Sequence, residues 1–266
     1  MLPMRTLGID LASQPADTAY CVIEWGDGTA VAEPPVVPAS DDVLLAEMEL
    51  ASITGVDAPC GWPDAFVEAV HGFAVDRVWP QPAPDKRMSH RETDRVVHDV
   101  CSMWPLSVSS DRIAACAWRA AHLLTTHAER TGWELDRIGV ADGEALADHA
   151  VVEVYPAAAL ALWALPARGY KSRRADGKEA SRDVRVAIIT GLERAGDSWL
   201  AISDEVREVC VDSDHALDAL ICALVARAAA TGRTLLPNRV QAEVAGREGW
   251  IHLPSADAIL DLGDTA

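Results

Sequence analysis

The chain has 266 residues, of which 50% are apolar and 24% charged, a balance typical of a globular protein large enough to bury a core without disulfides. Its formal net charge of −18 argues against casual binding to nucleic acid, because an acidic surface repels a polyanion. None of the six cysteines forms a CxxC pair, and no apolar run approaches the roughly 20 residues of a membrane span. We therefore expect a cytoplasmic protein with reduced thiols, no zinc ribbon and no membrane segment.

The first part of the chain predicts a three-stranded meander, a helix and a fourth strand. Alternating apolar residues indicate strands at 7–10, 18–25, 29–37 and 53–57. The glycines of 26–28 suit a tight hairpin turn, and Ser40 is placed to cap a helix that ends at Leu50. A helical crossover of this length permits the fourth strand to return parallel to the first.

The rest of the chain predicts helices around a fifth strand at 151–154 and a late edge strand at 249–253. The predicted helices are 64–71, 91–100, 109–130, 157–165, 181–195 and 214–230. These elements predict an α/β fold with a mixed five-stranded sheet flanked by helices. The expected limits are 1–254 for a single domain, about 60–150 and 166–210 for its helical and loop insertions, and 255–266 for an acidic C-terminal tail.

Three of the predicted strands end in an acidic side chain, namely Asp10, Asp57 and Glu153. An unpaired charge is costly to bury, so a carboxylate at a strand end either faces a site or caps a turn. Open α/β sheets favour ligand sites at the carboxyl ends of their strands. Each acid alone is explained by capping, whereas the set suggests carboxylates that converge on a cation.

The helix predicted at 214–230 adds two acids and a histidine at its start. Asp214 and Asp218 are four residues apart, so they share one face with His215 between them. Asp214 is also explained as a helix cap, but capping explains Asp218 less well because Asp218 interrupts an apolar stripe. Carboxylate oxygens are the ligands that Mg²⁺ and Mn²⁺ prefer, so these acids are candidate ligands.

A polar stretch before the helix at 91–100 offers two arginines. Arg91 and Arg95 are able to grip phosphate or carboxylate in a forked geometry. The alternative is a solvated helix start with internal ion pairs. His90, Asp94 and His98 follow at four-residue steps and form a weaker candidate for a metal site.

The most basic stretch of this acidic chain is 170–174. Lys171 and Arg173 are therefore candidates for a phosphate-binding flap over the acids. The alternative is a charged surface insertion that binds nothing.

The order strand, hairpin, helix, strand, with acids on the first and fourth strands and on the last long helix, resembles the ribonuclease H-like fold. The segment 215–220 looks like the catalytic-helix motif of Holliday-junction resolvases. A set of motifs in chain order resembles a domain-of-unknown-function family described as predicted nucleases of this fold. These motifs are Gly8-Ile9-Asp10-Leu11-Ala12, Val56-Asp57-Ala58-Pro59, Arg91-Glu92-Thr93-Asp94, Glu153-Val154-Tyr155-Pro156, Tyr170-Lys171, 215–219 and Glu248-Gly249-Trp250-Ile251.

The resemblance spans residues 7–254 and implies a set of roles. It implies that Asp10, Asp57 and Asp218 bind metal, with Glu153 or Asp214 as a fourth ligand. Many nucleases of this fold carry a longer Glu in place of Asp57, which is a departure from their pattern.

The function expected from these features is hydrolysis of a nucleic acid or nucleotide phosphodiester by water that Mg²⁺ or Mn²⁺ activates. His215 assists proton transfer in this hypothesis. Phosphates are held by basic side chains, namely Arg91, Arg95, Lys171 and Arg173. The net charge of −18 disfavours a nucleic-acid partner.

Two alternatives use the same strands. Gly8-Ile9-Asp10 before a hairpin also resembles the first phosphate loop of actin-like and sugar-kinase ATPases, but no second glycine-rich phosphate loop follows. A non-catalytic binding protein that retains the ribonuclease H-like fold is the other alternative. Dependence on a metal ion separates it from the enzyme, since a binding module needs no convergent carboxylates.

Overall fold

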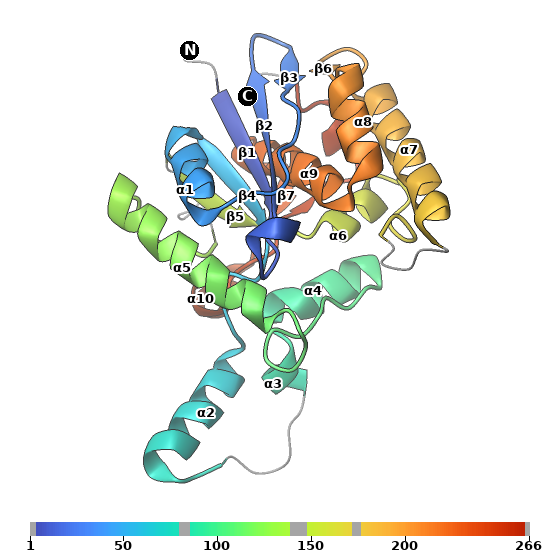
Figure 1. The fold of residues 1–266 in the computed structure, drawn as a ribbon. Helices are drawn as coiled ribbons and strands as arrows, with labels where there is room; N and C mark the ends of the chain where they lie inside the picture. Colours follow the sequence, from blue (N-terminus) through green and yellow to red (C-terminus); the bar gives the residue numbers. More distant parts are fainter. Residues whose placement is uncertain (1–3, 80–85, 139–147, 172–176, 264–266) are drawn as a thin grey trace.

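The computed structural model describes residues 4–79, 86–138, 148–171 and 177–263. Its centre is a mixed six-stranded sheet in the order β5-β4-β1-β2-β3-β6 (Figure 1). β1 is antiparallel to β2 and parallel to β4, while β5 extends the parallel half and β6 pairs in parallel with β3. The strands are β1 (Met4–Asp10), β2 (Ala19–Trp25), β3 (Ala30–Ala32), β4 (Ile53–Asp57), β5 (Ala150–Glu153) and β6 (Leu200–Ala201).

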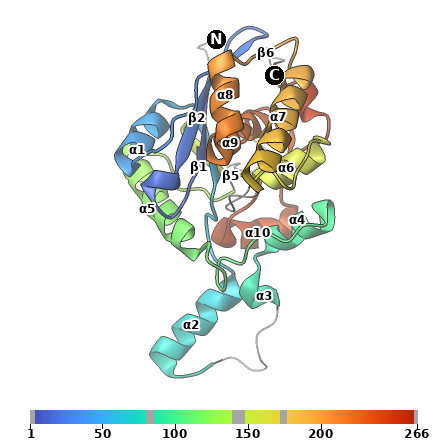
Figure 2. The same cartoon turned by 45° about the vertical axis from the view of Figure 1, so that its right-hand side comes forward.

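Helices cover both faces of this sheet. Those described are α1 (Asp41–Leu50), α2 (Asp64–Asp76), α3 (Lys86–Ser89), α4 (Glu92–Cys101), α5 (Ala114–Thr131), α6 (Pro156–Leu162), α7 (Lys178–Ala195), α8 (Asp204–Asp212), α9 (Asp214–Ala230) and α10 (Arg239–Glu248). α1 and α5 lie on one face and α7, α8 and α9 on the other, while α2 projects away from the sheet (Figures 1 and 2). A two-stranded ribbon, β7 (Thr234–Leu235) and β8 (Leu253–Pro254), completes the strands.

The α/β class and the mixed sheet confirm the coarse prediction, but the predicted strand count of five was one too few. β6 has two residues, which is too short for alternation to reveal it. The edge strand expected at 249–253 is a single parallel bridge between Ile251 and Glu153, followed by β8. In the described residues, no helix combines the length and the apolar composition that a membrane crossing requires.

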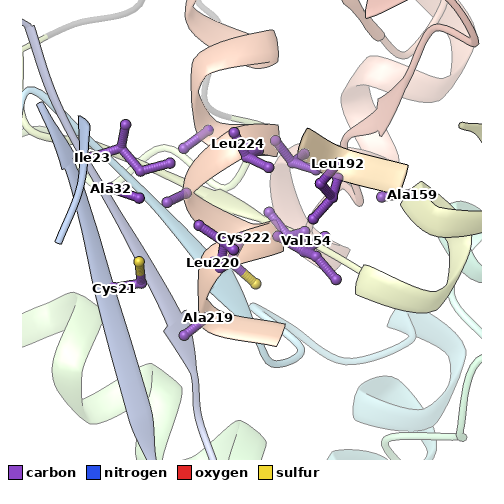
Figure 3. Close-up of a cluster of buried hydrophobic side chains, with 14 of the residues drawn as sticks. Cys21, Ile23, Ala32, Val154, Ala159, Leu192, Ala219, Leu220, Cys222 and Leu224 are labelled. Atoms are coloured by element: carbon purple, nitrogen blue, oxygen red, sulfur yellow. The ribbon is translucent and has the colours of Figure 1, made fainter. Parts of the chain in front are cut away.

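Strand alternation assigns the two faces of the sheet. Leu7, Ile9 and Val56 join the core under α1 and α5. Cys21 and Ile23 join the opposite core, in which α9 lies between the strands and α6–α7 (Figure 3). α9 is buried from residue 216 to residue 229, which is why this stretch is apolar around its whole circumference apart from Asp218 and Arg227.

Two glycines allow α9 to lie close to the sheet. Gly8 and Gly55 are register partners on β1 and β4. A Cβ added to Gly8 would lie 2.0 Å from the Ala219 carbonyl oxygen, and one added to Gly55 would lie 2.4 Å from the Cys222 carbonyl oxygen. Any larger side chain at either position would therefore push the helix away from the strands.

Candidate functional site

Three aspartates converge where β1, β4 and α9 meet. Asp10 and Asp57 are register partners at the ends of parallel strands, so both side chains leave the same face of the sheet. α9 crosses that face and contributes Asp218, which is fully buried. One carboxylate oxygen from each of the three lies within 4.8 Å of the others. The cluster can therefore hold a metal ion.

The pKa values reflect crowded negative charge in a poorly solvated place. Burial raises the pKa of Asp57 well above its usual range; the positive charge of Lys171 opposes the shift, and the charges of Asp10 and Asp218 add to it. Burial likewise raises the pKa of Asp218 to about 6, and Asp10 adds to the shift while Lys171 opposes it. Like charges at this separation favour the bound state of any cation.

One lysine and one tyrosine hold Asp218 from the side of the loop that precedes α7. The ammonium of Lys171 forms an ion pair with Oδ2 of Asp218, and the Tyr170 hydroxyl donates a hydrogen bond to Oδ1 at 3.0 Å. Burial lowers the pKa of Lys171, but the nearby acids outweigh that effect and raise the pKa well above its usual range. Lys171 is therefore a cation at this site, and its side chain is 47% exposed.

His215 extends the cluster toward solvent. Its Nδ1 lies 2.5 Å from Oδ2 of Asp10, and since a carboxylate only accepts, Nδ1 is the protonated nitrogen. That hydrogen bond raises the pKa of His215, burial opposes the shift, and the charges of Asp10, Asp214 and Asp218 add to it. Asp214 is the first residue of α9, whose cap is Ser213, and Asp214 is outside the group of converging carboxylates.

Glu153 lies on the other side of the sheet. It is the register partner of Val56 and therefore points away from the face that carries Asp57. Its two carboxylate oxygens accept hydrogen bonds from Arg91 at 2.6 and 2.8 Å, and the Cys60 amide donates to it at 2.9 Å. Glu153 is therefore a partner of Arg91 and not a fourth member of the aspartate cluster.

Arg91 is buried, with 2% of its surface exposed. Besides Glu153, its guanidinium binds Asp94 through Nη2 at 2.9 Å and Nε at 3.2 Å. Burial works against the charged form, but the two acids outweigh it and raise the pKa of Arg91 well above its usual range. The structure thus places Arg91 inside a buried ion network rather than on an open phosphate-binding surface.

Sequence reasoning assigned no role to Glu248, yet this buried acid holds two helix starts. Its Oε1 accepts the Asp64 amide at 2.8 Å, and its Oε2 accepts the Glu92 amide at 2.6 Å. Its carbonyl oxygen accepts from Arg91 at 3.2 Å. The only sequence signal for Glu248 was its place in the motif Glu248-Gly249-Trp250-Ile251 of the family resemblance, and no role was assigned to that motif.

Arg95, a further candidate for phosphate binding, has partners within the chain. Arg95 binds the Glu92 carboxylate at 2.5 Å and the His90 carbonyl oxygen at 2.9 Å. Arg173 lies outside the described residues.

The proposed grouping of His90, Asp94 and His98 is not a metal site. Asp94 is buried against Arg91, whereas the rings of His90 and His98 pack against Trp104 with centroids 4.6 and 4.1 Å away. The histidines are therefore aromatic partners of Trp104.

A cavity of about 470 Å³ adjoins the aspartates. Asp57, Tyr170 and Lys171 line it on that side, and Trp104 lines it as well. A volume of this size is within the range of small-molecule sites.

The donor set fits a hard divalent cation. Three carboxylates supply oxygen atoms and no sulfur, which suits Mg²⁺ or Mn²⁺ better than a soft metal. Burial is the main cause of the raised pKa values of Asp57 and Asp218; the neighbouring acids add to both shifts, and Lys171 opposes them. Asp10, Asp57 and Asp218 are the residues that would hold the ion.

These features define an α/β protein with a mixed six-stranded sheet and an aspartate cluster suited to a metal ion. The chain belongs to the DUF429 family, described as proteins of unknown function, whose family model matches residues 8–242. This confirms the expected membership of a domain-of-unknown-function family. No curated protein and no solved structure matches the chain significantly.

Proposed function

We propose that this protein is a Mg²⁺- or Mn²⁺-dependent phosphodiesterase with a ribonuclease H-like fold. The observation that carries the proposal is the convergence of Asp10, Asp57 and Asp218 within 4.8 Å at the carboxyl ends of parallel strands and on a buried helix. Phosphodiester cleavage is a reaction that carboxylate-held divalent ions accelerate. The resemblance of the ordered motifs to predicted nucleases supports the same reaction.

Tyr170 and Lys171 support the reaction from beside the aspartates. When bound, a divalent cation supplies water activation and charge stabilisation at a phosphoryl oxygen. Tyr170 fixes the orientation of Asp218 through its 3.0 Å hydrogen bond. Lys171, half-exposed beside the carboxylates, is placed to leave Asp218 and meet a phosphate oxygen.

His215 is the proton carrier in this proposal. Because Nδ1 donates to Asp10, Nε2 is the nitrogen that accepts a proton from the attacking water. Asp10 stabilises the resulting imidazolium, which agrees with the raised pKa of His215.

One observation favours the alternative of a binding protein without a metal. The Lys171 ammonium already pairs with Asp218, so a lysine alone is able to neutralise part of the cluster. In that case the aspartates serve stability, and divalent ions leave the protein unchanged.

Calorimetric titration with Mn²⁺ tests the proposal. We expect the wild-type chain to bind Mn²⁺, and Asp10→Asn and Asp57→Asn to lose binding by at least about 10-fold because each removes a charged ligand. Asp42→Asn is the matched control, since Asp42 is an exposed residue of α1. Hydrolysis of methyl p-nitrophenyl phosphate should require the metal and disappear in the same two variants. Absence of Mn²⁺ binding by the wild-type chain would favour the binding-protein alternative.

A further inference from the structure

We propose that the cavity beside the aspartates binds the nucleoside of a small substrate, so that this protein cleaves a phosphodiester attached to one nucleoside or joining a dinucleotide. The inference rests on the proposed phosphodiesterase function and names the class of its substrate. It follows from the position of the cavity, the chemistry of its walls and the charge of the chain.

The cavity and the aspartate cluster share side chains. Asp57 belongs to the group of converging carboxylates and also lines the cavity, and Lys171 pairs with Asp218 while lining the same space. A molecule in the cavity therefore lies directly beside the place where a phosphate would react. A nucleotide has this layout, since its base and its phosphate are separated by one sugar.

The walls of the cavity suit a flat, weakly polar group. Most are apolar or aromatic: Pro59, Pro105, Leu106, Ile113, Tyr155 and Ile251. Stacking and apolar contacts bind the flat faces of a base, so they act on any of the bases. These apolar side chains give little to a phosphate or a sugar, so the base is the part of a nucleotide that they select.

The charged side chains that line the cavity differ in whether they are available to bind a phosphate. Arg91 and Glu153 also line it, but they neutralise each other in the buried ion network. Arg168 and Lys171 are exposed and lie on the same side as Tyr170. Two exposed cations that line the cavity, one of them paired with Asp218, are enough to meet one phosphate group.

Trp104 lines the cavity, and its ring is packed against neighbouring side chains. His98 stacks on its ring at 4.1 Å and 23°, and the Lys86 ammonium lies 4.1 Å from the ring centroid. These contacts hold the indole in place without a ligand. The Trp104 side chain is therefore positioned before a ligand binds, and this reduces the ordering cost of binding.

The net negative charge of the chain favours a small substrate over a nucleic acid polymer. Binding a nucleic acid strand requires many phosphate contacts along a positive groove. This chain has 41 acidic residues against 23 lysines and arginines, so its net negative charge repels a long polyanion. A substrate with one or two phosphates avoids this repulsion because it enters a single cavity.

Two pairs of compounds test the inference: one pair compares binding, and the other compares hydrolysis. AMP and ribose 5-phosphate differ only in the base, and we expect AMP to bind at least about 10-fold more tightly in calorimetry with Mg²⁺. The p-nitrophenyl ester of thymidine 5′-monophosphate and methyl p-nitrophenyl phosphate share a leaving group. We expect kcat/KM to be at least about 10-fold higher for the thymidine ester.

Two substitutions that fill the cavity test its location. Leu106→Trp and Ala157→Phe each add bulk to a lining position, and we expect both to remove most of the preference for AMP and for the thymidine ester. Leu50→Trp is the matched control, because Leu50 is 67% exposed at the end of α1 and does not line the cavity. Thermal unfolding establishes that the variants are folded.

The outcomes separate the two proposals. If neither ester is hydrolysed with any divalent ion, the phosphodiesterase proposal fails, whether or not AMP binds. If the methyl ester is hydrolysed but AMP and ribose 5-phosphate bind equally, the nucleoside site is wrong and the phosphodiesterase stands. Faster cleavage of a 20-nucleotide strand than of a dinucleotide would overturn the inference of a small substrate and would indicate a nucleic acid substrate.

Discussion

Gly8 of β1 lies opposite Gly55 of β4, and each glycine precedes an aspartate of the candidate metal site by two residues. Because strand side chains repeat every two residues, both glycines face the same side as Asp10 and Asp57. α9 packs onto the two bare backbones, and this approach brings Asp218 to the other carboxylates. The spacing Gly-x-Asp on two strands thus combines close helix packing with placement of the acids.

This relationship predicts that Gly8→Ala separates the helix from the sheet. The new Cβ would lie 2.0 Å from the Ala219 carbonyl oxygen, which belongs to the backbone and cannot rotate away. We expect the free energy of unfolding to fall by about 1–3 kcal/mol or more, as for other overpacked cores. Mn²⁺ affinity should fall as well, because Asp218 moves with α9. Urea unfolding and calorimetry measure the two effects.

Gly246→Ala is the control for that substitution. Gly246 lies in α10, and a Cβ there meets nothing within 4 Å. We expect this variant to be more stable by roughly 0.5–1 kcal/mol, since alanine favours a helix over glycine, and to bind Mn²⁺ normally. Equal behaviour of the two variants would refute the role given to Gly8.

Lys171→Met should affect metal binding and hydrolysis in opposite directions. The ammonium competes with a metal ion for Asp218, so its removal should tighten Mn²⁺ binding by about 10-fold or more. The same change should lower kcat/KM for phosphodiesters, since a phosphate partner is lost. Lys178→Met, at the exposed start of α7, should change neither quantity. Weaker Mn²⁺ binding in Lys171→Met would contradict the competition.

Arg91→Met should act on stability. The substitution leaves Glu153 and Asp94 buried without their cation, and breaking such a network costs about 3–5 kcal/mol of unfolding free energy. Arg95→Met is the matched comparison, because its ion pair with Glu92 is partly exposed and should contribute less than about 1 kcal/mol. Similar losses in both variants would show that the Arg91 network is not the stronger one. Thermal and urea unfolding supply both values.

His252 should make folding sensitive to acid. It is buried, its Nε2 donates to the Ile138 carbonyl oxygen at 2.7 Å, and in the neutral ring Nδ1 therefore accepts from the Thr234 hydroxyl at 2.8 Å. Burial lowers its pKa to about 4, although the Ile138 carbonyl oxygen and Asp136 oppose the shift. The folded state therefore keeps His252 neutral under conditions that protonate it in the unfolded chain.

The sign of the pH effect follows from that difference. Above about pH 6.5, His252 is neutral in both states and contributes no pH dependence. As the pH falls toward 4, only the unfolded state gains the proton, so stability decreases by roughly 3 kcal/mol in total. His252→Gln should show a smaller loss between pH 7 and 4.5 than the wild type. Parallel stability curves for the two proteins would contradict the prediction.

Much of the site was present in local sequence signals. An apolar strand that ends in an acid was visible at Asp10 and Asp57, and the interrupted apolar stripe of α9 revealed Asp218. These signals are local because strand and helix periodicity extend over only a few residues. The sequence patterns did not predict the sixth strand or α10, because β6 has only two residues and α10 is largely polar and buries only Ala245 and Glu248.

The sequence by itself determined which residues carry charge and which strands end in an acid, because these are properties of the local chain. The tertiary structure decided which acids meet. Glu153 has the same local signal as Asp57, but β5 pairs with β4 so that Glu153 lies beside Val56 and faces the opposite side, toward Arg91. A shift of one residue in strand register reverses the face of every side chain, and no local pattern encodes that register.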